Sequence, residues 1–192
     1  NNPQSIQGDS VGNVYIADVS TTSTSGKIRK VASDGIISNF QTQLNFPQAV
    51  FADVFGNVYF AERGVNLVKK VDSSLAITTF AGGGTGGDGG QASDAVLSTP
   101  FALFVETTQA VYILENTGFK LRLVSPDGII STIAGNGTEG MAADGVLATS
   151  TMLRNPKGVW YNTANDEIYL VDPLENMVRR LGKWAPSPMP SF

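Results

Sequence analysis

The sequence contains no cysteine and no histidine. Without cysteine, these residues form no disulfide, offer no thiol nucleophile and build no thiolate metal site. Without histidine, they hold no Ser-His-Asp triad, no imidazole base and no imidazole-bound zinc, copper or iron. The chemistry left open is that of carboxylates, hydroxyls and calcium bound through oxygen.

Basic residues and long apolar runs are also scarce. The 192 residues include 13 Lys and Arg against 17 Asp and Glu, which gives a net charge of −4. This balance argues against nucleic acid as the main partner, because neutralising phosphates supplies most of that affinity. No stretch approaches the roughly 20 apolar residues of a membrane-spanning helix, so we expect no membrane insertion. The chain begins with Asn1 rather than Met and is interpreted as a processed or excised segment.

The main positive signal is an internal repeat. Four copies each open near a proline, at spacings of 44, 53 and 56 residues: Pro3, Pro47, Pro100 and Pro156. In the second copy, residues 49–52 are apolar on both faces, and residues 58–62 are rich in β-branched and aromatic side chains. Two further short segments, 67–71 and 77–80, complete that copy. Four short antiparallel strands at this period predict one blade of a β-propeller.

The predicted fold is therefore all-β, a propeller whose four repeats occupy residues 1–181. The expected blades cover residues 3–40, 47–81, 100–135 and 156–181. A small residue recurs at the third position of each first strand, where strands crowd around the axis: Ser5, Ala49, Ala102 and Gly158. The last copy has three strands, because residues 182–192 carry alternate prolines that cannot donate to a ladder. That stretch is predicted to be a polyproline-like tail or linker.

Three interpretations of the incomplete blade remain open. The chain is an arc of a larger propeller, or it is a small four-bladed propeller with a three-stranded final blade. In the third interpretation a neighbouring chain completes the blade, since an unpaired sheet edge is a template for another strand.

Several segments resemble the NHL repeat, namely Val14–Asp18, Ile28–Val31 and Ile130–Gly137. The Gly-rich linker from Gly87 to Pro100 and its echo from Asp144 to Pro156 do so as well. The resemblance covers about residues 3–181 and implies a propeller. It implies no single function, because NHL propellers include adhesion and sensor domains, scaffolds, RNA-binding domains and a few lyases. The lyases rely on histidine-bound metal, which this sequence cannot supply, and the net charge disfavours the RNA-binding branch.

Carboxylates form the candidate metal sites. One recurs at the end of each second strand, giving Asp18, Glu62, Glu115 and Asp172, and a ring of these could hold calcium. The favoured alternative is that each caps a local turn or pairs with a base that also recurs, namely Arg29, Lys69, Arg122 and Arg179. Asp88, Asp94 and Asp144 in the Gly-rich linkers are a second calcium candidate, of similar weight. No other cofactor is expected, because the two G-x-G-x-x-G stretches precede no helix and are interpreted as blade connections.

Two kinds of residue are candidates for glycosylation. Asn136 opens the one Asn-x-Ser/Thr sequon of the chain, and Ser187 and Ser191 lie beside prolines in the tail. For Asn136 the favoured alternative is that Asn136-Gly137-Thr138 simply follows the pattern of the NHL repeat that it resembles, and for the tail serines it is a plain polar linker. The loop from Ser20 to Gly26 is likewise expected to be flexible and exposed.

The sequence predicts a non-enzymatic interaction, scaffold or adhesion module that binds protein or glycan through propeller loops and edges. One alternative is a structural protomer of an extracellular fibre or coat, assembled through the incomplete blade. Another is a hydrolase or lyase with a carboxylate-bound metal in the central funnel. The abundance of Ser, Thr, Asn and Gly favours an extracellular or cell-surface location.

Overall fold

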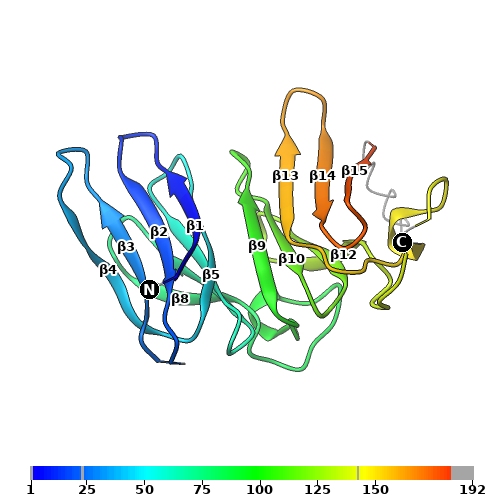
Figure 1. The fold of residues 1–192 in the computed structure, drawn as a ribbon, viewed down its shortest axis with the longest axis horizontal. Helices are drawn as coiled ribbons and strands as arrows, with labels where there is room; N and C mark the ends of the chain where they lie inside the picture. Colours follow the sequence, from blue (N-terminus) through cyan, green and yellow to red (C-terminus); the bar gives the residue numbers. More distant parts are fainter. Residues whose placement is uncertain (1, 23, 142, 183–192) are drawn as a thin grey trace.

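The computed structural model describes residues 2–22, 24–141 and 143–182. These residues confirm the expected all-β propeller fold, with four antiparallel sheets that each form one blade (Figure 1). Two short 3-10 helices, η1 (Ala92–Asp94) and η2 (Ala148–Ser150), lie in the linkers before the third and fourth blades. No helix among the described residues is long and apolar enough to cross a membrane.

The strands follow one another outward from the axis within each blade. Blade 1 contains β1 (Asn2–Gly8), β2 (Val14–Val19), β3 (Gly26–Val31) and β4 (Ile37–Leu44). Blade 2 contains β5 (Pro47–Ala52), β6 (Val58–Glu62), β7 (Leu67–Val71) and β8 (Ile77–Ala81). Blade 3 contains β9 (Pro100–Val105), β10 (Val111–Glu115), β11 (Lys120–Val124) and β12 (Ile130–Ala134). Blade 4 contains β13 (Gly158–Asn162), β14 (Glu167–Asp172) and β15 (Met177–Leu181).

Hydrogen bonds to an aspartate side chain stabilise the turn between the first and second strands of blades 1 and 2. In blade 2, Asp53 Oδ1 accepts hydrogen bonds from the backbone N–H groups of Phe55 (2.9 Å) and Asn57 (2.8 Å). Gly56 adopts a φ of 83°, a left-handed conformation that a side chain would disfavour. Asp9 makes the equivalent bonds in blade 1, to the N–H groups of Val11 and Asn13. These turns fix the hairpin register and therefore decide which side chains face the neighbouring blade.

The blades pack face to face, and one hydrophobic cluster fills each of the three junctions between consecutive blades. At the junction of blades 3 and 4, the rings of Tyr112 and Tyr161 stack with their centroids 5.3 Å apart. Ser5 Oγ accepts a hydrogen bond from Val50 N (3.3 Å) across the first junction, where a larger side chain would separate the strands. Ala49 occupies the corresponding register position in blade 2.

The four blades form an open arc. Consecutive first strands pack on each other, β1 on β5, β5 on β9 and β9 on β13. No comparable packing joins β1 to β13 within the described residues, and blades 1 and 4 stand at opposite ends of the row (Figure 1). Blade 4 has three strands in the described part of the chain, in agreement with the predicted incomplete blade.

Candidate functional site: the open fourth blade

The repeated carboxylates on the second strands bind the loop that leads into their own blade. Each of three accepts backbone N–H bonds from residues just before the first strand: Glu62 from Asn45 (2.8 Å), Glu115 from Ser98 (3.3 Å), and Asp172 from Arg154 and Asn155 (both 2.9 Å). Asp18 lies at the same position in blade 1 and is also buried. The carboxylates therefore stabilise the entry to each blade, because they replace the water that these N–H groups lose on burial.

Three of the four repeated bases, Lys69, Arg122 and Arg179, lie in ion pairs with carboxylates. The fourth, Arg29, donates from Nε to the backbone oxygen of Ser38 (3.4 Å). Lys69 Nζ lies 2.7 Å from Glu62 Oε1 in blade 2. Arg122 in blade 3 bridges two acids, with Nη1 3.3 Å from Glu115 Oε1 and Nη2 2.6 Å from Asp88 Oδ1. Burial raises the pKa of Glu115, and the Arg122 charge opposes that rise. The same arrangement recurs in blade 4, as shown next.

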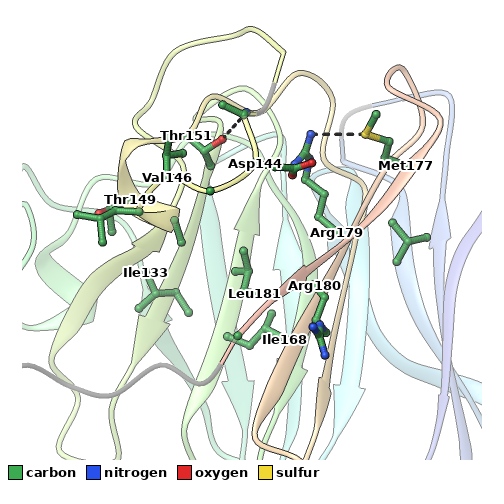
Figure 2. A pocket seen from close by; sticks show the side chains of 16 residues that line it. Ile133, Asp144, Val146, Thr149, Thr151, Ile168, Met177, Arg179, Arg180 and Leu181 are labelled. Atoms are coloured by element: carbon green, nitrogen blue, oxygen red, sulfur yellow. Dashed lines mark hydrogen bonds and ion pairs between the residues drawn. The ribbon is translucent and has the colours of Figure 1, made fainter.

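Arg179 of blade 4 holds the preceding linker. Its Nη1 lies 2.6 Å from Asp144 Oδ1 (Figure 2). Its Nη2 lies 3.4 Å from Glu175 Oε2. The bond to Asp144 corresponds to the Asp88–Arg122 bond of blade 3. The structure therefore places two of the three linker candidates for calcium in ion pairs, while Asp94 lies in η1 with an exposed side chain.

The four second-strand carboxylates do not converge on one site. They belong to four different sheets, and the described residues contain no group of three or more acidic side chains arranged to hold a metal ion. For these positions the geometry favours the structural role over the calcium ring. Asn136 is exposed, and its Oδ1 accepts a hydrogen bond from Thr138 N (2.9 Å). The other glycosylation candidates, Ser187 and Ser191, lie outside the described residues.

A groove of about 810 Å³ runs between β15 and the linker before blade 4. Figure 2 shows Arg179, Arg180 and Leu181 of β15 along one side and Val146 and Thr149 of the linker along the other. Apolar and polar side chains line it in similar measure. The large apolar ones are Ile133, Val146, Leu147, Ile168 and Leu181, and the charged ones are Asp144, Arg179 and Arg180. In the sequence this groove gives no local signal, because it forms where a linker crosses the outer end of a blade.

Blade 3 shows what fills the corresponding space elsewhere in the chain. There β12 lies between β11 and the linker that precedes the blade. Ile130 N donates to Gly90 O (3.0 Å), and Gly89 N donates to Ile130 O (2.8 Å). In blade 4 no described strand lies beyond β15, so the groove has the position of a fourth strand.

Burial along the repeat identifies a second exposed surface. Four third-strand residues share one register position, and three are fully buried whereas the last is open: Ile28 0%, Val68 0%, Leu121 0% and Val178 67% exposed. Trp160 and Val171 on the same side of blade 4 are 53% and 40% exposed. We call Trp160, Val171 and Val178 the open face. Interior blades cover the corresponding side chains with the next blade.

Within the described residues, fold and site together define an open propeller arc in which β15 pairs on one side only. No protein-family model and no curated protein matches the sequence, so NHL membership stays a prediction. Solved structures are similar in fold. An auxiliary nutrient binding protein from Bacteroides ovatus has a TM-score of 0.71 at 17% identity, over 93% of this chain and 47% of its own. A chain of a nidogen/laminin complex has a TM-score of 0.64 at 13% identity, over 94% of this chain and 64% of its own.

A lyase is similar at a greater distance. A catalytically inactive histidine-to-alanine variant of virginiamycin B lyase from Staphylococcus aureus, crystallised with quinupristin, has a TM-score of 0.55. It is 14% identical, and the match covers 98% of this chain and 56% of the lyase. This chain therefore spans about half the length of the nutrient-binding protein and the lyase. At such identities these likenesses concern the fold alone.

Proposed function

We propose that this chain is a non-enzymatic binding module that binds another protein at the open side of its fourth blade. The observation that carries the proposal is the exposure of Val178, because the same position is fully buried in the other three blades. An apolar side chain that is exposed in one repeat, although its equivalents are buried in all the others, marks an interaction site. The binding proteins among the similar folds support this choice. An extracellular or cell-surface location belongs to the same proposal.

The carboxylate-metal enzyme is less well supported than binding. The similar lyase is described as inactive once a histidine is replaced by alanine, and this sequence has no histidine. The candidate acids Glu62, Glu115 and Asp172 are already bound by backbone N–H groups. A glycan partner is also less well supported than protein, because the groove offers large apolar side chains beside a strand that pairs on one side only among the described residues.

Peptide selection tests the binding function without assuming a partner. We expect peptides enriched from a random display library on the wild-type chain to bind it and to lose binding to Val178→Glu, because a charge on the open face opposes apolar docking. Val54→Glu is the matched control, since Val54 is 56% exposed in the turn between β5 and β6. Selected peptides that bind Val178→Glu as well as the wild type would contradict the proposal.

A structural protomer is the second candidate, and one observation favours it. Blade 4 exposes the side that interior blades turn to the next blade, while blade 1 exposes the opposite side, with Ile6 66% and Ile37 50% exposed. Two copies could therefore stack head to tail. In that case sedimentation velocity is expected to show association that grows with concentration and is lost in both Ile6→Glu and Val178→Glu. A single 20.2 kDa species up to near-millimolar concentration would rule this candidate out.

A further inference from the structure

We propose that the groove beside β15 is a binding site for one extended polypeptide strand supplied by another protein. The bound strand would pair with β15 along one edge and with the linker backbone around Gly145 and Val146 along the other. This inference rests on the proposed binding function and adds to it the place, the conformation and the side-chain pattern of the ligand.

The two linkers are equivalent, residue by residue, around the groove. Gly82 N donates to Ala92 O and Gly135 N donates to Ala148 O, both at 2.9 Å. With Ala92 and Ala148 in register, Asp88 corresponds to Asp144, and the ion pairs of both acids agree with this alignment. Gly89 and Gly90, which pair with β12 in blade 3, then correspond to Gly145 and Val146. The latter two make no backbone hydrogen bond to the described residues, and β15 pairs with β14 alone among the described strands.

The ion pairs hold each linker at the distance of one intervening strand. In blade 3 the Arg122–Asp88 contact, at 2.6 Å, joins β11 to a linker that lies beyond β12. In blade 4 the Arg179–Asp144 contact has the same length of 2.6 Å. Neighbouring strands lie about 4.8 Å apart, so β15 and its linker are separated by about twice that spacing. A single extended chain therefore fits between them, and it would have hydrogen-bond partners on both sides.

Blade 3 also indicates which side chains the site accepts. Ile130 and Ile133 of β12 are buried at 0% and 3% exposure, while Ser131 and Thr132 between them are partly exposed. Ile130 faces the preceding blade and Ile133 the following one. In blade 4 the position equivalent to Ile130 therefore lies on the side of Ile168 and Leu181, whereas the position equivalent to Ile133 lies on the side of the open face. The ligand class is thus an extended segment whose apolar residue at the position of Ile130 packs against blade 3.

The residues that directly follow β15 in the sequence are poorly suited to form this strand. Along β12, Ile130 directs its N–H and C=O toward the linker, so Ser131 and Ile133 direct theirs toward β11. In the sequence after β15, Pro188 and Pro190 stand at the positions equivalent to those two residues. Proline has no N–H, so that sequence lacks the donors that β15 requires. The fifteen described strands already pair within their own blades, so none of them is spare in a second copy.

A synthetic peptide with the sequence of residues 127–135 tests the site directly. We expect saturable binding with one peptide per chain by calorimetry, and NMR amide shifts confined to β15 and residues 143–149. Val146→Glu is expected to weaken the affinity by at least about tenfold, because it places a charge beside the apolar side chains of the groove. Val96→Glu is the matched control, since Val96 is 53% exposed and Val146 is 50% exposed in equivalent linkers. A peptide with proline in place of Ser131 and Ile133 is expected not to bind.

The outcomes separate this inference from the function on which it rests. Absence of binding, or binding that neither Val146→Glu nor the two prolines weaken, overturns the strand site. If display selection still yields Val178-dependent peptides, the binding function stands and its contact is the open face alone. If those peptides are also absent, both proposals fail. Unchanged melting temperatures of the two glutamate variants show that the loss of binding is not a loss of folding.

Discussion

Replacing Arg122 with methionine is expected to lower the free energy of unfolding by about 3–5 kcal/mol, because removing one partner of a buried ion pair leaves an uncompensated charge. The Arg122 side chain is 5% exposed, and that of Glu115 is 3% exposed. Methionine fills similar space and cannot neutralise the carboxylate. Urea unfolding at neutral pH measures the loss, with Arg180→Met as control. Arg180 pairs with Glu167 but is 64% exposed, so its replacement should cost less than about 1 kcal/mol.

The pH dependence identifies the cause of that loss. Burial already raises the pKa of Glu115, and removing Arg122 removes a charge that opposes the rise. A folded-state pKa above the unfolded value means that the folded protein binds the proton more tightly. The stabilisation from this proton is complete below the pKa of Glu115 in the unfolded chain. It is lost as the pH rises through the pKa of Glu115 in the folded protein. The variant should therefore recover stability relative to the wild type as the pH falls from neutral toward the ordinary carboxyl range.

A second substitution keeps the interpretation falsifiable. Glu115→Gln in the Arg122→Met background removes the charge, so it should restore part of the stability at neutral pH and reduce the pH-dependent recovery. A smaller part of the recovery remains through Asp88, whose side chain is 49% exposed. Burial acts against the shift, but hydrogen bonds with Thr132 and the Arg122 charge lower the pKa of Asp88, and the variant loses the Arg122 contribution. A loss that is the same at every pH, or that the Gln substitution does not reduce, would show that packing and not charge explains the effect of Arg122.

The repeat made the blades predictable from the sequence. Strand segments, turn residues and the small column that includes Ser5 recur at one period, and each blade is built from contacts close in the chain. The sequence also predicted a three-stranded last blade, from the alternate prolines that follow β15, and the described residues of blade 4 contain three strands. These features depend on local backbone chemistry, and local chemistry is what a single sequence displays most directly.

The groove and the ion-pair partners were not predictable in the same way. The sequence indicated that Arg122 would find an acid, but Asp88 lies 34 residues away and meets it through the path of the linker. The same holds for Asp144 and Arg179, 35 residues apart. Aligning the two linkers through Asp88 and Asp144 was the available signal for the groove. This alignment points to the groove only once it is known that each linker crosses the outer edge of the following blade, which is a tertiary feature.

Equivalent positions of the repeat differ in burial between the interior blades and the last one, so the same kind of substitution should have different effects on stability. Leu121→Ala is expected to lower the free energy of unfolding by about 2–5 kcal/mol, because it opens a cavity in a fully packed junction. The Leu121 side chain is 0% exposed and belongs to the cluster between blades 3 and 4. Differential scanning calorimetry and urea unfolding measure the loss.

Val68 and Val178 provide the matched pair, since both are valines at that register position and differ in burial, 0% against 67% exposed. Val68→Ala should cost about 1.5–3 kcal/mol by lost burial and cavity formation. Val178→Ala should stay within about 0.5 kcal/mol, as surface substitutions do. Comparable losses at both positions would mean that something already covers the last blade in solution. The open face would then not be a free binding surface, and the proposed function would lose the observation that carries it.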